Sequence, residues 1–478
     1  TLKDSTGNTY VLNGDGTATK TVSGGSSSTI TDADIIATLT ALPVAYTELT
    51  STTNQTKFTT YLGKTFNNMD SSTWASGTGF DPIGNTTDNP FTGALQGFGG
   101  DSVHTISNLT INRPTVDNIG LIGVASGATM EQLELSTAAI TGKNYVGGIA
   151  GQLLNGSTIT WSSNSGEGLA GTTAATSGFV KVAKQADPDT GERTNIGGLA
   201  GYVNGSTISY SGNSATVIGQ TDSITDLNVT KVGGVAGSAV NGANLLNVEN
   251  SGNVFGEKET GGIVGYAEDS TVGSKASSDD TTAATFNRGQ VTGTEDTAGI
   301  VGHAKGITLY GVYNTNEDTA LSSNSQLNIS PDGVIESRVG GSTVGVGSKV
   351  GDEAAKSAYG KITGTTNTAG IVGLMEKGTN DSSIDTAYNA GNITGTTNTG
   401  GIVGKMTSGT ITNAYNGDNN TVLRTSIGTV PAAVSSFSKT LTINGNKETY
   451  TYSASDAAYC SFYTMDGITK TMYYFIPV

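Results

Sequence analysis

The stretch Gly261-Gly262-Ile263-Val264-Gly265 returns along the chain with small changes, and its repetition decides the fold. The phrase is a small residue, a glycine, an aliphatic residue, Ala or Val, and a final glycine. Seven clear copies begin at Gly147, Gly197, Gly233, Gly261, Ala298, Ala369 and Gly400. An earlier copy begins at Ile119, and Gly340-Gly341-Ser342-Thr343-Val344-Gly345 resembles a decayed copy in the widest gap. The chain is therefore an array of one repeated unit.

The spacing of the phrase gives the length of the unit. Gly234 and Gly262 are 28 residues apart, and the longer gaps contain extra polar residues. Each unit also has a second half, in which an aromatic or apolar residue precedes Asn and Gly. Examples are Tyr210-Ser211-Gly212-Asn213, Phe286-Asn287-Arg288-Gly289 and Tyr388-Asn389-Ala390-Gly391. One unit is therefore expected to form two half-turns.

Apolar residues within each half alternate with Ser, Thr and Asn, as in Ser157-Thr158-Ile159-Thr160-Trp161. This period of two is typical of β-strands, and a short helix is expected only near Asp32 to Leu42. Short strands, Gly and Asn corners and the repeat length predict an all-β chain folded as a parallel β-helix of about nine or more coils. Each coil would hydrogen-bond to its neighbours at a spacing of about 4.8 Å.

The phrase residues then acquire structural roles. We expect the aliphatic residue of each copy to point inward and form a ladder; these residues are Ile149, Leu199, Val235, Ile263, Ile300, Ile371 and Ile402. The central glycines would supply positive φ at corners or allow close approach of stacked coils; they are Gly148, Gly198, Gly234, Gly262, Gly299, Gly370 and Gly401. The recurrent Asn beside Gly would either stack as an amide ladder or tolerate left-handed corners.

These repeats resemble the GLUG motif of bacterial secreted and surface proteins. Gly400 to Gly404, with the preceding stretch Tyr388 to Gly395, matches that motif closely. The leading stretch from Phe80 to Ile111 resembles the coils that precede such repeats in adhesin-like, filamentous haemagglutinin-like proteins and in the stalks of some secreted immunoglobulin proteases. The resemblance, with the general bias of parallel crossovers, implies a right-handed helix. The chain carries no zinc-protease signature, so the resemblance implies an extracellular location and not a catalytic activity.

Composition agrees with an extracellular setting. The chain has 478 residues, 69 glycines, one cysteine and a formal net charge of -16. Its low apolar content implies stabilisation by backbone pairing rather than by a thick core. The acidic balance disfavours nucleic acid and anionic membrane surfaces as partners. The lone Cys460 cannot form an internal disulfide, and no stretch is long and apolar enough for a membrane span.

The two ends of the chain differ from the array. Residues 1–70 and 421–478 are expected to be β-rich segments that flank the repeats at 71–420, with a hairpin at Asn444-Gly445. An open β-helix exposes unpaired strand edges, which such segments either cap or use for head-to-tail addition of another copy. The assembly candidates are Tyr473, Tyr474, Phe475, Ile476 and Val478.

Catalytic machinery is sparse in the sequence. The two histidines, His104 and His303, are far apart, and His303 is expected at a variable outward position directly after a phrase glycine. Asp187, Asp189 and Glu192 form a possible calcium loop without the full twelve-residue pattern, and a solvated turn is the competing interpretation. No other cofactor is expected.

The sequence therefore predicts an extracellular or cell-surface structural or adhesive protein that is not an enzyme. Its partners would be further copies of itself, or a surface glycan or protein. The alternative is a carbohydrate-active β-helix enzyme, a polysaccharide lyase or glycosidase, with carboxylates in a groove beside the coils.

Overall fold

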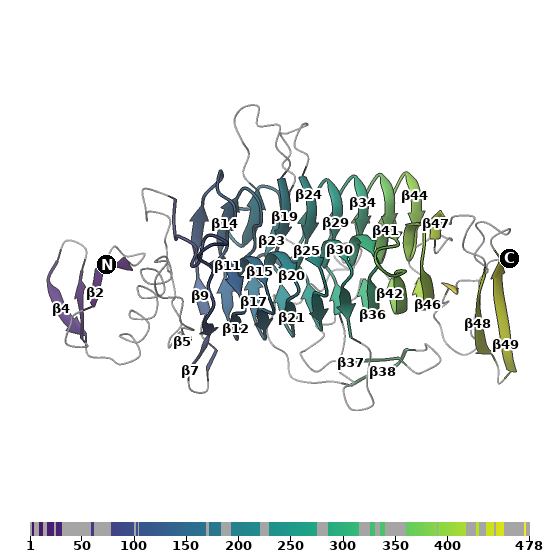
Figure 1. Cartoon of the computed structure of the whole chain (residues 1–478), viewed down its shortest axis with the longest axis horizontal. Coiled ribbons are helices and arrows are strands. Elements are labelled where there is room, and N and C mark those ends of the chain that lie inside the picture. Colours follow the sequence, from purple (N-terminus) through teal and green to yellow (C-terminus); the bar gives the residue numbers. More distant parts are fainter. Residues whose placement is uncertain are drawn as a thin grey trace, which may run out of the picture.

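The computed structural model describes residues 78–99, 102–103, 105–168, 172–182, 193–219, 229–274, 285–314, 360–389 and 391–416 of the repeat region. Outside that region it describes the short stretches 2–3, 9–12, 17–22, 25–30, 59–61, 326–329, 335–339, 427–429, 436–443, 446–453 and 473–474. The described residues contain strands and no α-helix, so the predicted all-β class is confirmed (Figure 1). The predicted helix near Asp32 to Leu42 lies outside them.

Four sheets, whose strands are parallel with one exception, form the walls of a long rod (Figure 1). We number them I to IV in the order in which one coil passes through them. Sheet I has six strands: β19 (Arg193–Gly197), β24 (Val229–Gly233), β29 (Lys258–Gly261), β34 (Glu295–Ala298), β40 (Thr366–Ala369) and β44 (Thr397–Gly400). Sheet II has nine: β11 (Ile122–Ser126), β15 (Ala150–Leu154), β20 (Ala200–Asn204), β25 (Ala236–Val240), β30 (Val264–Glu268), β35 (Val301–Lys305), β41 (Val372–Glu376), β45 (Val403–Met406) and β47 (Ile427–Thr429).

Sheet III is bent and receives two strand segments from most coils. Its strands are β5 (Thr59–Tyr61), β6 (Ala94–Gln96), β9 (Thr105–Ser107), β12 (Thr129–Glu131), β13 (Glu134–Ser136), β16 (Thr158–Thr160), β17 (Ser163–Ser165), β21 (Thr207–Ser209), β22 (Gly212–Asn213), β26 (Asn244–Leu246), β27 (Glu249–Asn250), β31 (Thr271–Gly273), β32 (Thr285–Asn287), β36 (Thr308–Asn314), β42 (Ser383–Asn389), β46 (Thr410–Asn416) and β50 (Tyr473–Tyr474). Sheet IV contains β10 (Thr110–Asn112), β14 (Ala139–Gly142), β18 (Phe179–Val182), β23 (Thr216–Ile218), β28 (Val254–Phe255), β33 (Val291–Thr292), β39 (Ile362–Thr363) and β43 (Ile393–Thr394).

The coils stack in register, one repeat unit per coil. Ala236 of β25 pairs with Val264 of β30, which in turn pairs with Val301 of β35. Sheet II therefore contains one strand from each of nine coils, and the predicted parallel β-helix is confirmed. The copy of the phrase that begins at Ile119 is genuine, because Ile122 pairs with Ala150. The right-handed sense stays a prediction.

The predicted aliphatic ladder fills the interior. The side chains of Ile149, Leu199, Val235, Ile263, Ile300, Ile371 and Ile402 are completely buried. The next residue of each phrase, such as Ala150 or Val264, is also completely buried and begins a strand of sheet II. Each phrase therefore supplies two consecutive layers of the core.

A second interior ladder is made of asparagines. It consists of Asn213, Asn250, Asn287, Asn314, Asn389 and Asn416, which are buried in sheet III. In each pair of successive coils, the side-chain Nδ2 donates to the Oδ1 of the next Asn at 2.7–2.9 Å. The same amide usually also donates to the backbone carbonyl two residues further on, at 2.8–3.2 Å. Of the two roles that the sequence left open, the structure shows the amide ladder.

The asparagine ladder explains the central glycine of the phrase. A Cβ on Gly234 would overlap the side chain of Asn250 and the carbonyl oxygen of Gly262 in the next coil. The same overlap with the facing Asn occurs at the other six central glycines. None of these glycines has positive φ, so close approach, and not left-handed geometry, requires glycine there. The prediction of positive φ is therefore wrong for the phrase glycines.

Two sequence alignments are corrected by the strand register. Val301 pairs directly with Val372, and Asn314 pairs with Asn389, so no coil of the stack lies between these two and the segment that links them is an insertion. The decayed copy at Gly340–Gly345 lies outside the described residues. The insertion contains the antiparallel pair β37 (Gln326–Ile329) and β38 (Ile335–Val339). The second correction concerns Tyr210, which is not equivalent to Phe286, because Gly212 occupies that row.

Antiparallel pairs occur towards both ends of the chain. β1 (Leu2–Lys3), β2 (Thr9–Leu12), β3 (Ala18–Thr21) and β4 (Ser27–Ile30) form one small sheet, and β7 (Phe98–Gly99) pairs with β8 (Ser102–Val103). β48 (Ser436–Ile443) and β49 (Asn446–Ser453) pair up to Ile443 and Asn446, which confirms the predicted hairpin at Asn444-Gly445. Tyr473 and Tyr474 of β50 pair antiparallel with Asn416 and Tyr415 at the last coil. The predicted boundaries at residues 70 and 420 stay predictions.

Candidate functional surface

Outward side chains of sheet II form a row along the rod, directly after the last glycine of each phrase. The row is Gln152, Tyr202, Ser238, Tyr266, His303, Leu374 and Lys405, held in register by the strand pairing. This confirms the outward position expected for His303. The chemistry of the row changes from coil to coil, because no interior contact restricts it.

A second row lies beside the first and covers part of it. Its members sit two residues before each phrase and all have positive φ; they are Tyr145, Asn195, Lys231, Glu259, Asp296, Asn367 and Asn398. The final glycine of each phrase allows this contact, since a Cβ on Gly265 would overlap the backbone of Lys231 and Glu259. We call the two rows together the lateral seam.

The seam is closed by contacts between neighbouring coils. Ser238 donates to the side-chain oxygen of Asn195 at 2.5 Å. Tyr145 and Tyr202 make an edge contact with ring centroids 5.7 Å apart, and the ammonium of Lys231 lies 4.7 Å from the Tyr266 ring centroid. The side chains of the seam therefore find many of their partners in the neighbouring coils of the same chain.

The densest group of titratable side chains on the seam surrounds His303. Its Nδ1 lies 3.2 Å from Oε1 of Glu259 and 3.7 Å from Oδ2 of Asp296. Its Nε2 lies 3.2 Å from Oε2 of Glu376. The edge of the imidazole also packs against Tyr266, with ring centroids 5.3 Å apart. One imidazole thus bridges carboxylates from three successive coils.

The pKa values of this cluster are shifted. Burial acts to lower the pKa of His303, but the hydrogen bond that its Nδ1–H donates to Glu259 and the charges of Asp296, Glu259 and Glu376 outweigh it, and the pKa is raised. Burial raises the pKa of Asp296 to about 6, although the hydrogen bond from Asn367 and the nearby His303 oppose the shift. The surrounding carboxylates therefore favour the protonated imidazole, and its contacts give it a bridging role between coils.

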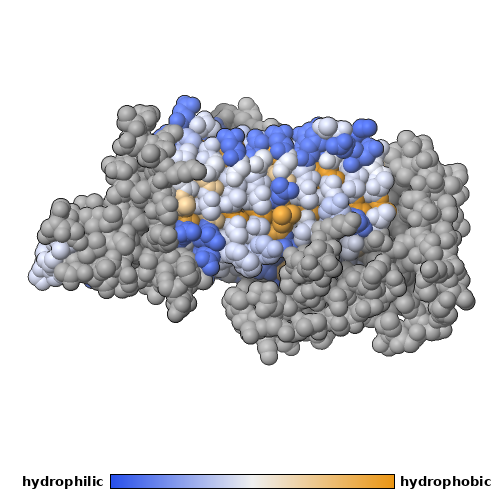
Figure 2. Space-filling model, turned by 60° about the horizontal axis from the view of Figure 1, so that its bottom comes forward, coloured by the Kyte–Doolittle hydropathy of each residue, from blue (hydrophilic) through white to orange (hydrophobic). Residues whose placement is uncertain are grey.

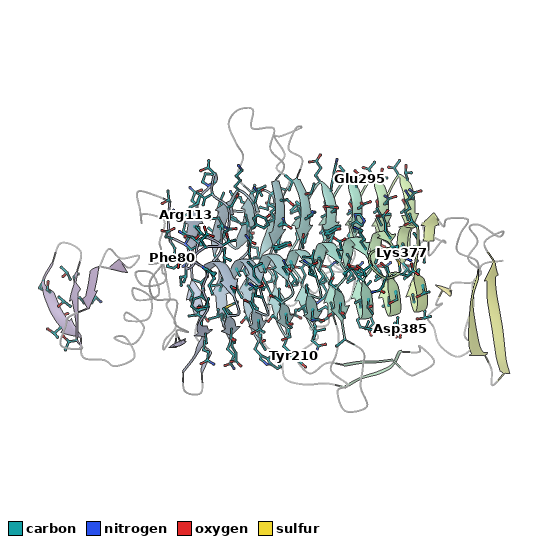
Figure 3. The ribbon with its side chains drawn as sticks, in the orientation of Figure 1. Phe80, Arg113, Tyr210, Glu295, Lys377 and Asp385 are labelled. Carbon is teal, nitrogen blue, oxygen red and sulfur yellow. The ribbon has the colours of Figure 1, made fainter. Side chains whose placement is uncertain are left out.

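A different surface carries two exposed aromatic rings. Trp161 and Tyr210 lie at the bend of sheet III in adjacent coils, where the two strand segments of each coil meet. Their rings are stacked, with centroids 4.5 Å apart and planes 9° apart. Trp161 is 53% exposed and Tyr210 is 38% exposed. Tyr210 lies at the lower edge of the rod in Figure 3.

Sequence reasoning missed this pair because it assigned Tyr210 to the wrong row. The correct signal is the residue directly after a Thr-Ile-Thr or Thr-Ile-Ser strand, as in Thr158-Ile159-Thr160-Trp161. Lining up those strands places Trp161, Tyr210 and Asn247 at one corner. Sequence reasoning also missed the second row of the seam, although its members always lie two residues before the phrase.

Several candidates fall outside the described residues. These are Asp187, Asp189 and Glu192 of the calcium candidate, together with Phe475, Ile476 and Val478 of the tail, His104 and Cys460. Tyr473 and Tyr474 are described as strand β50. Among the described residues, no three His, Cys, Asp or Glu side chains form a group that could hold a metal ion. The same residues contain no helix long and apolar enough to cross a membrane.

Comparison with known proteins gives partial matches. No family model matches the chain, and no solved structure matches it significantly. The chain is 46% identical over 83 residues to halomucin of Haloquadratum walsbyi, a match covering 17% of this chain and 1% of halomucin. It is 32% identical over 160 residues to the immunoglobulin A1 protease of Streptococcus pneumoniae, covering 31% of this chain and 8% of the protease. Both relatives are large surface or secreted proteins, of which the chain spans only a small part. The resemblance to GLUG repeats stays a prediction.

Proposed function

We propose that this chain is a rigid rod within an extracellular structural or adhesive protein. The observation that carries the proposal is the in-register stacking of whole coils, fastened inside by the asparagine ladder. Nine strands in sheet II, spaced by about 4.8 Å, give a rod about 40 Å long. Such a stack holds its outward side chains in straight rows, which is a property that structural and adhesive proteins use.

The surface of the rod supports this role. The part of the chain coloured in Figure 2 is pale and polar over most of its face, with strongly hydrophilic side chains gathered along one long edge. A net charge of -16 opposes side-by-side clustering of such rods. The matches to large surface or secreted proteins support an extracellular location. Partners would be a surface glycan or protein, or another copy joined end to end by strand addition.

Electron microscopy of the secreted chain tests the proposal. Straight rods of uniform width, single or joined end to end, are expected, and compact round particles would contradict it. The alternative of a polysaccharide lyase or glycosidase predicts new reducing ends or unsaturated products after incubation with plant and host polysaccharides. A rod that leaves those polysaccharides unchanged is expected.

A further inference from the structure

The backbone at Trp161 and Tyr210 is unusual for residues of their size. Both have positive φ, 52° for Trp161 and 48° for Tyr210. At the same corner, other coils carry Gln132, Asn247, Gly311 and Thr386, also with positive φ, and of these Asn and Gly tolerate the left-handed conformation best. Bulky aromatic residues do not favour it, and backbone strain of this kind is typical of functional positions.

The backbone that carries the two rings is held in place by hydrogen bonds. The backbone N–H of Trp161 donates to the carbonyl of Ser209 at 3.2 Å, and that of Tyr210 donates to the carbonyl of Leu246 at 3.0 Å. Paired strands flank both residues, since β16 pairs with β21 and β17 pairs with β22. Among the residues whose side-chain exposure the structure describes, these are the only exposed aromatic residues. The stack therefore projects from a backbone that strand pairing holds in place.

Neutral hydrogen-bonding groups share the corner with the rings, and the carboxylate of Glu131 lies in the row of Thr160 one coil earlier. The amide side chain of Gln132 occupies the same corner in the coil before Trp161, and that of Asn247 occupies it in the coil after Tyr210. Next to the rings, the hydroxyls of Thr160 and Ser209 lie 3.2 Å apart. Gln132, Trp161, Tyr210 and Asn247 thus form a stripe along the rod, with two aromatic rings in the middle and an amide at each end. We call it the aromatic corner.

We propose that the aromatic corner binds a neutral oligosaccharide lying along the rod. A sugar ring presents apolar C–H faces that pack on aromatic rings, and hydroxyls that pair with amides and hydroxyls. A stable protein partner needs an interface of about 1,000 Å² or more, far larger than two rings. The net charge of -16 opposes anionic glycans. This inference rests on the adhesive role proposed above and names its site and ligand class.

Native gels containing a dissolved polysaccharide test the inference on the full chain. The probes are galactomannan, xyloglucan and a mixed-linkage glucan as neutral polymers, with polygalacturonate as the acidic one. We expect a neutral polymer to retard the wild-type chain and the variants Trp161→Ala and Tyr210→Ala to bind at least tenfold more weakly. Tyr202→Ala, which removes an aromatic ring from the seam, is the matched control and should bind as the wild type does.

A second pair of variants separates binding from folding. Trp161→Asn and Tyr210→Asn place at the corner the residue that the next coil already carries at Asn247. They should melt at the wild-type temperature or above it and lose binding. In a Trp74→Phe background, the fluorescence of Trp161 should change when the retarding neutral polymer is added.

Three results would overturn the inference. They are no retardation of the wild type by any neutral polymer, unchanged binding by Trp161→Asn, and retardation by polygalacturonate alone. If electron microscopy shows straight rods but no polymer binds, the sugar-binding inference is wrong and the proposed rod is still supported. Compact particles would contradict the rod itself.

Discussion

The buried asparagines explain why the second residue of the phrase is glycine in all seven clear copies. The first residue is less restricted, since it is Ala in two of them. At the second position of all seven clear copies a Cβ would overlap the facing asparagine, which is Asn164 for Gly148 and a ladder residue for the other six glycines. The two halves of the repeat, which are separate in the sequence, therefore constrain each other across the interior. The order of the phrase reflects packing against the amide ladder more than turn geometry.

The first prediction concerns the amide ladder. Asn287→Ala removes the Oδ1 that accepts from Asn250 and the Nδ2 that donates to Asn314 and to the carbonyl of Gly289. The free energy of unfolding should fall by about 2–4 kcal/mol, because buried partners lose hydrogen bonds and a cavity forms. Thermal melting followed by circular dichroism measures the change.

Thr297 supplies the matched control, because its Oγ1 is buried without a hydrogen-bond partner. Thr297→Val keeps the shape and removes only that hydroxyl, so stability should be unchanged or higher. A drop in stability with Thr297→Val as large as that with Asn287→Ala would show that any interior change, and not loss of amide bonding, weakens the rod.

The second prediction concerns the aliphatic ladder. Ile371 is completely buried, and Ile371→Asp places an unpaired charge between two coils at a cost of several kcal/mol, roughly 3–5. Ile371→Val should cost only about 1 kcal/mol, since it removes one methyl group. Native-like melting of the Asp variant would contradict the inward orientation of this side chain.

Sequence reasoning predicted the residues whose environment repeats, and it failed where the environment depends on neighbouring coils. The period marked Ile371 and its equivalents as inward, because a ladder needs an aliphatic residue in every coil. The contact between Gly234 and Asn250 could not be predicted, since it depends on how the two halves of a coil face each other. Trp161 and Tyr210 were missed because a site made of two residues in adjacent coils leaves no periodic signal.

At the scale of elements, the third prediction treats the insertion after β36 as dispensable. The Nδ2 of Asn314 donates to the carbonyl of Gly360 at 2.8 Å, which repeats the bond from Asn250 to Gly252 two residues away. One linking residue can therefore replace the insertion. Deleting residues 316–359 leaves Asn314-Thr315-Gly360, which has the form of Asn287-Arg288-Gly289.

The deletion variant should fold with a melting temperature within a few degrees of the wild type. The physical reason is that β36 and β42 already pair over their whole length without the insertion. Circular dichroism and electron microscopy provide the measurement. Loss of the cooperative transition would mean that the segment contributes to the stack.

The fourth prediction is a pH dependence that arises between three coils. The folded pKa of His303 is raised above its unfolded value, so its stabilising effect is complete below about pH 6.5 and is lost as pH rises through the folded pKa. Asp296, with a pKa of about 6 in the folded state against 3.8, also binds its proton more tightly when folded. Both shifts make the rod less stable as pH rises from about 4 through the folded pKa of His303.

The matched variant is His303→Leu, because Leu374 occupies the same row in the next coil. Without the imidazolium, Glu259, Asp296 and Glu376 lose their bridging cation, while Tyr266, Glu268 and Lys305 remain nearby. The wild type should melt several degrees above the variant near pH 5.5, and the gap should narrow above pH 7. An equal gap at both pH values would assign the effect to packing and not to charge.

At the scale of the whole molecule, the rod follows from the repeat, but its ends do not. Repetition alone predicts a stack with open strand edges, since every coil can pair with a further one. The ends have non-repeating sequences, so no repeat pattern predicts how their strands pair. The structure places β50 antiparallel on β46, at the last coil, and β5 parallel on β6 near the first.

The fifth prediction tests whether the aromatic tail joins rods end to end. Deleting Tyr473 to Val478 removes β50 and exposes the backbone groups of Tyr415 and Asn416, with which it pairs. If the tail of one copy adds to the end of another, electron microscopy should show fewer and shorter end-to-end assemblies after the deletion. If β50 serves instead as a cap on its own coil, the deletion should expose an edge and increase assembly. Assemblies of unchanged length would exclude the tail from both roles, so one experiment separates joining, capping and neither.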